Sequence, residues 1–315
     1  MKNLLVWLEW PERCFRAEEP EIGFLRRLCP DSAAVSRVRD EEEFLERLPG
    51  ADAAIVWHFK KEWFALAPRL ELLATPSAGR ELVAWRDAPA RTKVHFGGFH
   101  GAIISETVAG FVLASAHGFF RRELAVSSAW RDDWPRVALS DKCSLVAGTR
   151  VVIAGYGKVG RAIGAKLAAL GVEVSGFGRS GVGGFREAAA TADWLVLALP
   201  GDTGTDGFLD AETISLLPRR CTVINVGRGN AVDEDALLEA LREGRIAGAY
   251  LDVFRGEPGA GSPDAADPTR RSAGGILALP RGSLPPNLVM TPHSSAFCAE
   301  YLPMCFKELK DEGLI

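Results

Sequence analysis

The sequence predicts an α/β fold built from two parallel sheets, one in each half of the chain. Short apolar stretches of strand length alternate with polar stretches of helical length along both halves, which is typical of strands joined by crossover helices. A glycine-rich turn follows one of these apolar stretches near the middle of the chain. The 315 residues are enough for two domains with separate cores.

The first hundred residues contain four strand candidates and one clear helix. The helix is expected at Asp40–Leu48, because Phe44, Leu45 and Leu48 share one face of it. A longer helix is expected at Ser105–Glu123, where apolar residues recur with helical spacing. The strand candidates are Leu4–Leu8, Ala53–Trp57, Leu70–Thr75 and Lys93–Phe96.

From Thr149 onward the alternation is more regular. Helices are expected at Val159–Leu170 and Glu234–Glu243, and a long irregular segment, Gly259–Ser283, interrupts the pattern. A last helix is expected at Phe297–Leu309, with Leu302, Phe306 and Leu309 facing inward. The six strand candidates are Arg150–Ala154, Val172–Phe177, Trp194–Leu199, Thr222–Val226, Ala249–Val253 and Leu288–Met290.

Composition and charge limit the class of protein. Apolar residues make up 47% of the chain and charged residues 25%, as in ordinary globular proteins. The net charge of −4 gives no indication of a nucleic-acid partner. No stretch is long enough to span a membrane and the apolar start is too short for a signal peptide, so we expect a cytoplasmic protein. The six cysteines lack the spacing of a zinc site and are expected to be reduced, and no metal site is predicted.

A dinucleotide site is predicted at Gly155-Tyr156-Gly157-Lys158-Val159-Gly160. The first glycine permits a tight turn, the second lets a pyrophosphate approach the backbone, and the third allows close packing of helix on sheet. The turn lies between a predicted strand and a predicted helix, whose N-terminus would face the phosphates. This context disfavours the alternative of a glycine-rich turn without a ligand, and it predicts a Rossmann-type doubly wound sheet.

The end of the second strand of this sheet bears on the choice of cofactor. A carboxylate that would bind the ribose 2′-hydroxyl of NAD is expected there, but the position holds Gly178. Arg179 and Ser180 follow, and a guanidinium with a hydroxyl suits a 2′-phosphate. The sequence therefore favours NADP(H) over NAD(H). The alternative is that Arg179 is a solvated charge without influence on the cofactor.

Three polar residues at the ends of predicted strands suit hydride transfer to a 2-keto acid. His293 is the best candidate to donate a proton to the keto oxygen, because imidazole titrates near neutral pH. Glu257 would pair with His293 and orient it, and Arg228 would hold the substrate carboxylate. Each residue alone could be an ordinary surface or turn residue. Their joint position at strand ends, where α/β sheets bind ligands, favours the catalytic interpretation.

These motifs, in this order, resemble the D-2-hydroxyacid dehydrogenase family. The similarity extends over most of the chain, and Ala53–His58 with Gly178–Ser180 resembles the glyoxylate/hydroxypyruvate reductase branch. The resemblance implies a flavodoxin-like α/β substrate domain, residues 1–98 plus 293–315, and an NAD(P)-binding domain, residues 99–292. The matching segments are Leu199-Pro200 with Thr205, Asn225–Gly229, Asp233–Leu237, Leu251–Pro258 and Thr291–Ala296.

The resemblance also implies further site residues and an assembly. Ala78 and Gly79 match a loop whose amides bind the substrate carboxylate. Asp252 matches a position near the nicotinamide, and the alternative is a strand-end carboxylate that caps local backbone. Trp57 and His58 are expected near the substrate, although core packing is an equal alternative for Trp57. A homodimer is expected, with the aromatic segment Ala129–Asp141 at its interface. The remaining cofactor-binding residues implied are Pro200, Thr205, Val226 and Gly227.

The predicted activity is reduction of a small 2-keto acid, with glyoxylate or hydroxypyruvate as the first candidates. A formate-dehydrogenase-like reaction is disfavoured because it moves no proton and needs no acid beside the imidazole, whereas Glu257 is present. The alternative from another class is an NAD(P)H-sensing or corepressor-like binding protein on the same scaffold. The set of Arg228, Glu257 and His293 argues against a purely binding role.

The distance between Glu257 and His293 along the chain is longer than the family pattern leads one to expect.

Overall fold

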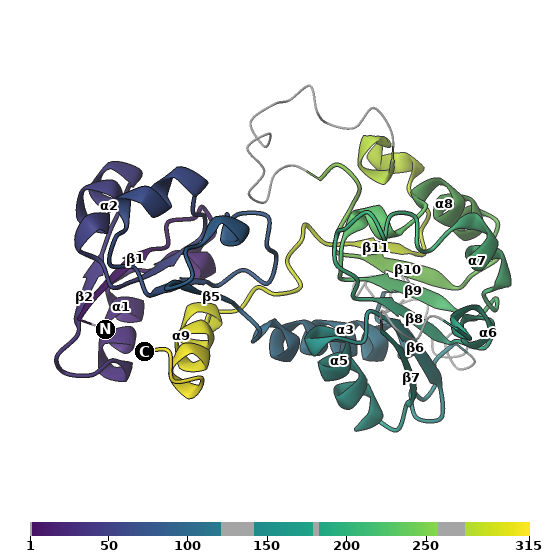
Figure 1. Cartoon of the computed structure of the whole chain (residues 1–315). Coiled ribbons are helices and arrows are strands. Elements are labelled where there is room, and N and C mark those ends of the chain that lie inside the picture. Colours follow the sequence, from purple (N-terminus) through teal and green to yellow (C-terminus); the bar gives the residue numbers. More distant parts are fainter. Residues whose placement is uncertain (1, 121–141, 179–182, 258–274) are drawn as a thin grey trace. The chain divides into compact units, whose positions relative to one another are not determined.

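A computed structural model describes residues 2–120, 142–178, 183–257 and 275–315 (Figure 1). The chain divides into two compact units. The first unit comprises Met1–His100 and Ala296–Ile315. The second comprises the described residues of Gly101–Pro258 and of Asp267–Ser295. The predicted segment Ala129–Asp141 and most of Gly259–Ser283 lie outside the described residues.

The first unit contains a five-stranded sheet in which every neighbouring pair is parallel. The strand order is β2-β1-β3-β4-β5, the flavodoxin-like order, so the chain changes direction of travel across the sheet between β1 and β3. The strands are β1 (Asn3–Trp7), β2 (Ala34–Arg37), β3 (Ala53–Val56), β4 (Leu72–Thr75) and β5 (Lys93–Phe96).

Three helices of the first unit cover this sheet: α1 (Glu19–Leu28), α2 (Glu41–Arg47) and the C-terminal α9 (Tyr301–Asp311). Phe44 and Leu48 are fully buried, as predicted from their spacing. Leu302, Phe306 and Leu309 of α9 are also buried, which confirms the predicted inward face of the last helix. The final segment of the chain therefore contributes to the core of the first unit.

The second unit contains a six-stranded parallel sheet of order β11-β10-β9-β8-β6-β7. The order in which the chain adds strands reverses between β6 and β8, although all strands are parallel. The carboxyl ends of these two strands therefore flank the switch point where α/β sheets bind ligands. The strands are β6 (Arg150–Ala154), β7 (Glu173–Phe177), β8 (Trp194–Leu197), β9 (Thr222–Asn225), β10 (Gly248–Leu251) and β11 (Leu288–Met290).

The helices of the second unit that are described are α3 (His100–Ala116), α5 (Lys158–Ala168), α6 (Phe185–Ala189), α7 (Ala211–Leu216) and α8 (Glu234–Arg242). The buried faces of this sheet consist almost wholly of aliphatic side chains, as expected for strands covered on both faces. None of the helices in the described ranges is long and apolar enough to cross a bilayer.

The structure differs from the sequence prediction at two elements of the first unit. Strand β2 was not predicted, because its four residues are half-exposed at the sheet edge and lack an apolar run. Helix α1 was not predicted either, since Pro20 and Gly23 obscure its periodicity. Pro20 lies in the first turn, where its missing N–H costs little, and Glu18 and Glu21 form a capping box. All six cysteines are free, as expected.

Candidate active site

The glycine-rich turn joins β6 to α5 and requires glycine at its first and third positions. Gly155 has φ +90°, and a Cβ there would lie 2.4 Å from the carbonyl oxygen of Ala198. A Cβ at Gly160 would lie 2.3 Å from the carbonyl oxygen of Gly155. At Gly157 a Cβ would meet no atom within 4 Å in the described structure, so the space above this residue is open. The turn thus has the shape that a pyrophosphate needs, and α5 begins there without a side-chain cap.

Tyr156 is a packing residue of this turn. A Cβ at Gly176 in β7 would lie 2.3 Å from its ring, and one at Gly164 in α5 would lie 2.9 Å from its hydroxyl. The ring therefore fills the space between α5 and β7 that these two glycines leave. Lys158 and Val159 begin α5. Strand β7 ends at Phe177, and the predicted contacts of Arg179 and Ser180 lie outside the described residues.

Arg228 follows β9 in a tightly constrained turn. Asn225 is 1% exposed, and its side chain accepts from the N–H of Gly227 and donates to the carbonyl of Arg228. A Cβ at Gly229 would lie 1.9 Å from the carbonyl carbon of Phe254, so this turn must pass close to the end of the neighbouring strand. The half-buried Arg228 side chain packs over Gly201, and its Nη1 donates to the carbonyl of Gly227 at 2.9 Å.

His293 and Glu257 meet across the ends of two adjacent strands, β10 and β11. His293 Nδ1 lies 2.8 Å from Glu257 Oε1, although 36 positions separate them in the sequence. The side chains are 37% and 23% exposed, so the pair is accessible to solvent. Because Nδ1 faces the carboxylate, Nε2 is the ring nitrogen that is available to a reacting group.

The backbone around His293 is held in an unusual conformation. His293 has φ +52°, and it is the single non-glycine residue with positive φ in the described ranges. Its N–H donates to the carbonyls of Asp252 and Thr291. Such outliers cost about 1–3 kcal/mol and persist where surrounding contacts fix them, which is frequent at functional sites.

Asp252 supplies those surrounding contacts. Its carboxylate is fully buried and accepts from the N–H groups of Ser294 and Ser295 at 2.8 and 2.9 Å. It also accepts from the hydroxyl of Thr291 at 2.5 Å. The sequence leaves two interpretations of Asp252 open, a place near the nicotinamide and a carboxylate that caps local backbone. In the structure its oxygens bind the turn that carries His293, so within this unit Asp252 positions the imidazole.

A second buried carboxylate joins two described residues that are far apart in the sequence. Glu234, at the start of α8, is 6% exposed and accepts from the N–H groups of Arg255 and Ile276 at 2.8 and 2.9 Å. These two residues stand on either side of positions 258–274. Glu234 therefore brings Arg255 and Ile276 together, and Glu257 contacts His293 although many residues separate them in the sequence. Sequence reasoning assigned no such role to Glu234.

The other residues predicted to bind the cofactor lie at the ends of β8 and β9. The Thr205 hydroxyl lies 2.6 Å from the carbonyl oxygen of Pro200 and closes the loop after β8. Val226 is 6% exposed, and a Cβ at Gly227 would lie 2.6 Å from the backbone nitrogen of Leu199. These residues shape the carboxyl edge of the sheet, on which Arg228 and the glycine-rich turn also lie.

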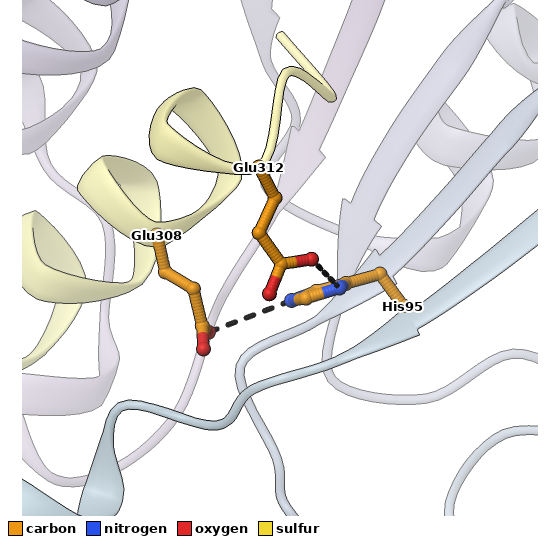
Figure 2. A group of neighbouring side chains, drawn as sticks. All are labelled: His95, Glu308 and Glu312. Carbon is orange, nitrogen blue, oxygen red and sulfur yellow. Dashed lines mark ion pairs between the residues drawn. The ribbon is translucent and has the colours of Figure 1, made fainter.

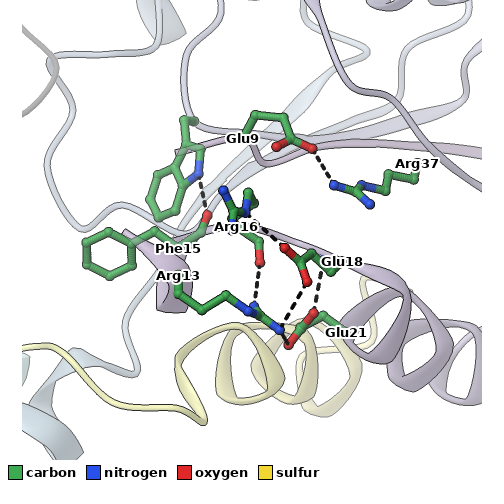
Figure 3. A network of polar contacts seen from close by, with 8 residues as sticks. Glu9, Arg13, Phe15, Arg16, Glu18, Glu21 and Arg37 are labelled. Atoms are coloured by element: carbon green, nitrogen blue, oxygen red, sulfur yellow. Dashed lines mark hydrogen bonds and ion pairs between the residues drawn. The ribbon is translucent and has the colours of Figure 1, made fainter. Parts of the chain in front are cut away.

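In the first unit, Trp57 lies at the end of β3 in an aromatic cluster. It is 7% exposed, and its indole N–H donates to the carbonyl of Phe15 at 2.9 Å. Arg13, Arg16, Glu18 and Glu21 form a polar network around Phe15 (Figure 3). Within this unit, Trp57 therefore has a packing environment, the alternative that the sequence left open.

His58 and the loop after β4 complete the predicted substrate side. The His58 ring lies against Trp7 and Trp63, with centroid distances of 4.7 and 5.6 Å. Burial among these rings lowers the pKa of His58, which favours its neutral form. Ala78 is exposed and Gly79 half-buried on the loop after β4, so the backbone of this loop is accessible in the first unit.

The structure thus places the glycine-rich turn, Arg228, Glu257 and His293 after the carboxyl ends of strands of one sheet. This combination of a dinucleotide cradle, an arginine and an imidazole paired with a carboxylate is typical of a nicotinamide-dependent dehydrogenase. A family model for the D-isomer specific 2-hydroxyacid dehydrogenase, NAD binding domain, matches residues 110–295. The chain belongs to the D-isomer specific 2-hydroxyacid dehydrogenase family, whose members are oxidoreductases that act on CH–OH donors with NAD(P).

Curated relatives and solved structures agree with this assignment. A glycerate dehydrogenase from Methylorubrum extorquens is 29% identical over 285 residues, 86% of this chain and 84% of that protein. A glyoxylate reductase from Thermococcus kodakarensis is 26% identical over 266 residues, 76% of this chain and 74% of that protein. The crystal structure of a D-isomer specific 2-hydroxyacid dehydrogenase from Xanthobacter autotrophicus Py2 in complex with NADPH and MES is 26% identical, with a TM-score of 0.71 over 98% of this chain and 96% of that chain.

Proposed function

We propose that this enzyme reduces a small 2-keto acid, glyoxylate or hydroxypyruvate, to the D-2-hydroxy acid. The observation that carries the proposal is the 2.8 Å contact of His293 with Glu257 at the carboxyl edge of the sheet. The names of the relatives, glycerate dehydrogenase and glyoxylate reductase, favour this substrate class at 26–29% identity. Homodimerisation and a cytoplasmic location remain predictions.

In this mechanism His293 and Arg228 act on the two polar ends of the substrate. The nicotinamide, when bound, supplies the hydride to the keto carbon. Arg228 binds the carboxylate and stabilises the negative charge that develops on the keto oxygen. His293 donates its Nε2 proton to that oxygen, and Glu257 holds the ring through Nδ1 and stabilises the protonated imidazole before transfer.

The glycine-rich turn would hold the pyrophosphate of the cofactor, and the residues present fit that group. Gly157 leaves open space where the phosphates would approach, and it is the N-cap residue of α5, whose N-terminus has no side-chain cap. We propose NADPH as the preferred reductant. Gly178 offers no carboxylate to bind a ribose 2′-hydroxyl, and the similar dehydrogenase structure from Xanthobacter autotrophicus Py2 is a complex with NADPH.

The assignment is tested by following absorbance of the nicotinamide with each keto acid, using NADPH and NADH separately. We expect faster oxidation of NADPH. His293→Ala should lower kcat by about 10²–10⁴-fold, because the proton donor is lost, while cofactor binding measured by fluorescence is retained. His117→Ala is the matched control, since His117 is an exposed histidine of the same unit outside the site. Cofactor binding without turnover by the native chain would favour the sensing role instead.

A further inference from the structure

A second group of ionisable side chains lies in the first unit, where β5 meets the C-terminal helix α9. His95 of β5 faces Glu308 of α9 and Glu312, the residue that caps the C-terminus of this helix (Figure 2). His95 Nδ1 lies 3.3 Å from Glu312 Oε2, and Nε2 lies 3.5 Å from Glu308 Oε2. The cluster therefore joins two segments of the unit that are far apart in the sequence.

The imidazole of this cluster is buried but incompletely satisfied. His95 is 8% exposed, and its Nε2 has no hydrogen-bond partner within the described part of the chain. Buried polar atoms without partners are rare in native proteins and call for a physical explanation. Nε2 points toward the Glu308 carboxylate at a distance too long for a hydrogen bond.

The charges of the cluster are also unbalanced. Two carboxylates face one imidazole, and no lysine or arginine among the described residues forms an ion pair with either of them. Glu308 is held in place, because both of its oxygens accept from the N–H of Gly98, at 3.0 and 2.9 Å. Glu312 is 42% exposed, so its side chain can adjust and the cluster is open to solvent on that side.

We propose that His95, Glu308 and Glu312 form a binding site for a divalent transition metal of the Zn²⁺ class. One imidazole nitrogen and two carboxylate oxygens are a common donor set for such ions, and water would complete the coordination. One donor atom from each residue lies within 4.8 Å of the others. Donors that share a zinc ion lie about 3.5 Å apart, so side-chain movements on the order of 1 Å bring the three into coordination.

The metal explains each feature of the cluster. It supplies a partner for Nε2 of His95 and positive charge between the two carboxylates. The N–H of Gly98 bound to Glu308 acts as the outer contact that orients a ligand, as is usual around protein metal sites. The ligands come from β5 and from α9 with its C-cap, so a bound metal would hold the C-terminal helix against the sheet. The site is separate from the ends of β3 and β4, where the substrate residues are predicted.

The experiment is titration of the chelator-treated full chain with ZnCl₂, followed by calorimetry and by thermal unfolding. We expect one zinc ion per chain that is absent from His95→Gln, and a rise in Tm of roughly 5 °C at saturation. Glu312→Gln should weaken this binding about 10–100-fold. Because Glu312 is half-exposed, this variant keeps the test informative even if His95→Gln does not fold.

Asp311→Asn, an exposed acid on the same helix, is the matched control and should bind zinc as the native chain does. Any zinc that binds at His293 or at a cysteine contributes equally to all these variants, so differences in binding between them report on the His95 cluster alone. Absence of zinc binding to the native chain, or equal binding by the native chain and Glu312→Gln, would overturn the proposal. Neither result depends on turnover of a keto acid.

Discussion

The two sheets of this protein have the same strand order around their switch points, yet their carboxyl edges carry different chemistry. In the second unit, His293 and Glu257 are partly exposed and paired with each other. In the first unit, Trp57 stands at the corresponding end of β3 but is buried, and its N–H binds the carbonyl of Phe15. Topology alone therefore does not make a strand end reactive.

The difference comes from what surrounds each strand end. In the second unit, the buried side chains of Asp252 and Asn225 form hydrogen bonds with the turns that carry His293 and Arg228, and these two side chains are only partly buried. In the first unit, aromatic rings close around Trp57 and His58. Buried polar atoms that hold backbone turns create a reactive edge, whereas aromatic packing creates a core. Substitutions at each edge test this contrast.

The largest effect is expected from Trp57→Ala in the first unit. Removing the indole from the aromatic cluster should lower the free energy of unfolding by about 3–5 kcal/mol. Trp57→Phe should cost about 1 kcal/mol, since it removes the hydrogen bond to Phe15 but keeps most of the ring packing. Chemical denaturation measures both changes. An increase in KM for Trp57→Phe with unchanged stability would break the contrast, because it would place Trp57 at the substrate.

Arg228→Lys should affect activity instead of stability. Lysine keeps the charge but loses the planar fork that binds a carboxylate through two parallel hydrogen bonds. We expect kcat/KM for the keto acid to fall by about 10²–10³-fold with Tm unchanged. Arg219→Lys, at an exposed arginine of the same unit, should leave steady-state kinetics as they are. A large drop in Tm for Arg228→Lys would instead mean that this side chain is structural.

Asp252→Asn should reduce both stability and activity. The amide group places a donor where the N–H groups of Ser294 and Ser295 now donate, so at least one buried donor loses its acceptor. The expected cost is about 1–3 kcal/mol of unfolding free energy, together with a fall in kcat because the His293 turn loses its support. Denaturation and steady-state kinetics on the same preparation measure the two effects. Normal kcat with lowered stability would separate Asp252 from the positioning of His293.

The smallest effect, and one that depends on pH, is expected from Asp52→Asn in the first unit. The backbone N–H groups of Asn3 and Lys2, with Arg69, lower the pKa of Asp52 to about 2. Because the folded state favours the charged form, the stabilisation is present above the unfolded pKa of about 3.9 and is lost as pH falls toward 2.

The native chain should therefore exceed Asp52→Asn in stability by about 1–2 kcal/mol near neutral pH. The difference should disappear between about pH 4 and pH 2, as measured by denaturant unfolding across that range. A difference that stays constant with pH would mean that hydrogen-bond geometry, not the charge of Asp52, is responsible.

Much of the second unit could be predicted because its signals are local. The turn from Gly155 to Gly160 is specified by glycines that close contacts require, and the strands are continuous apolar runs. In the first unit, β2 and α1 escaped prediction, since an edge strand needs no apolar run and a Pro20 in the first turn resembles a break. The positions of Arg228 and His293 at strand ends were also predictable from those runs.

The sequence by itself determined the family, the parallel sheets and the residue types available for hydride transfer, because these depend on short-range patterns of glycine, charge and apolar spacing. The tertiary structure alone decided which of those residues meet. The contact of His293 with Glu257, the hydrogen bonds of Glu234 with Arg255 and Ile276, and the His95 cluster all join positions distant in the chain. The register of parallel strands and the packing of α9 create these contacts, and neither can be predicted from short-range sequence patterns.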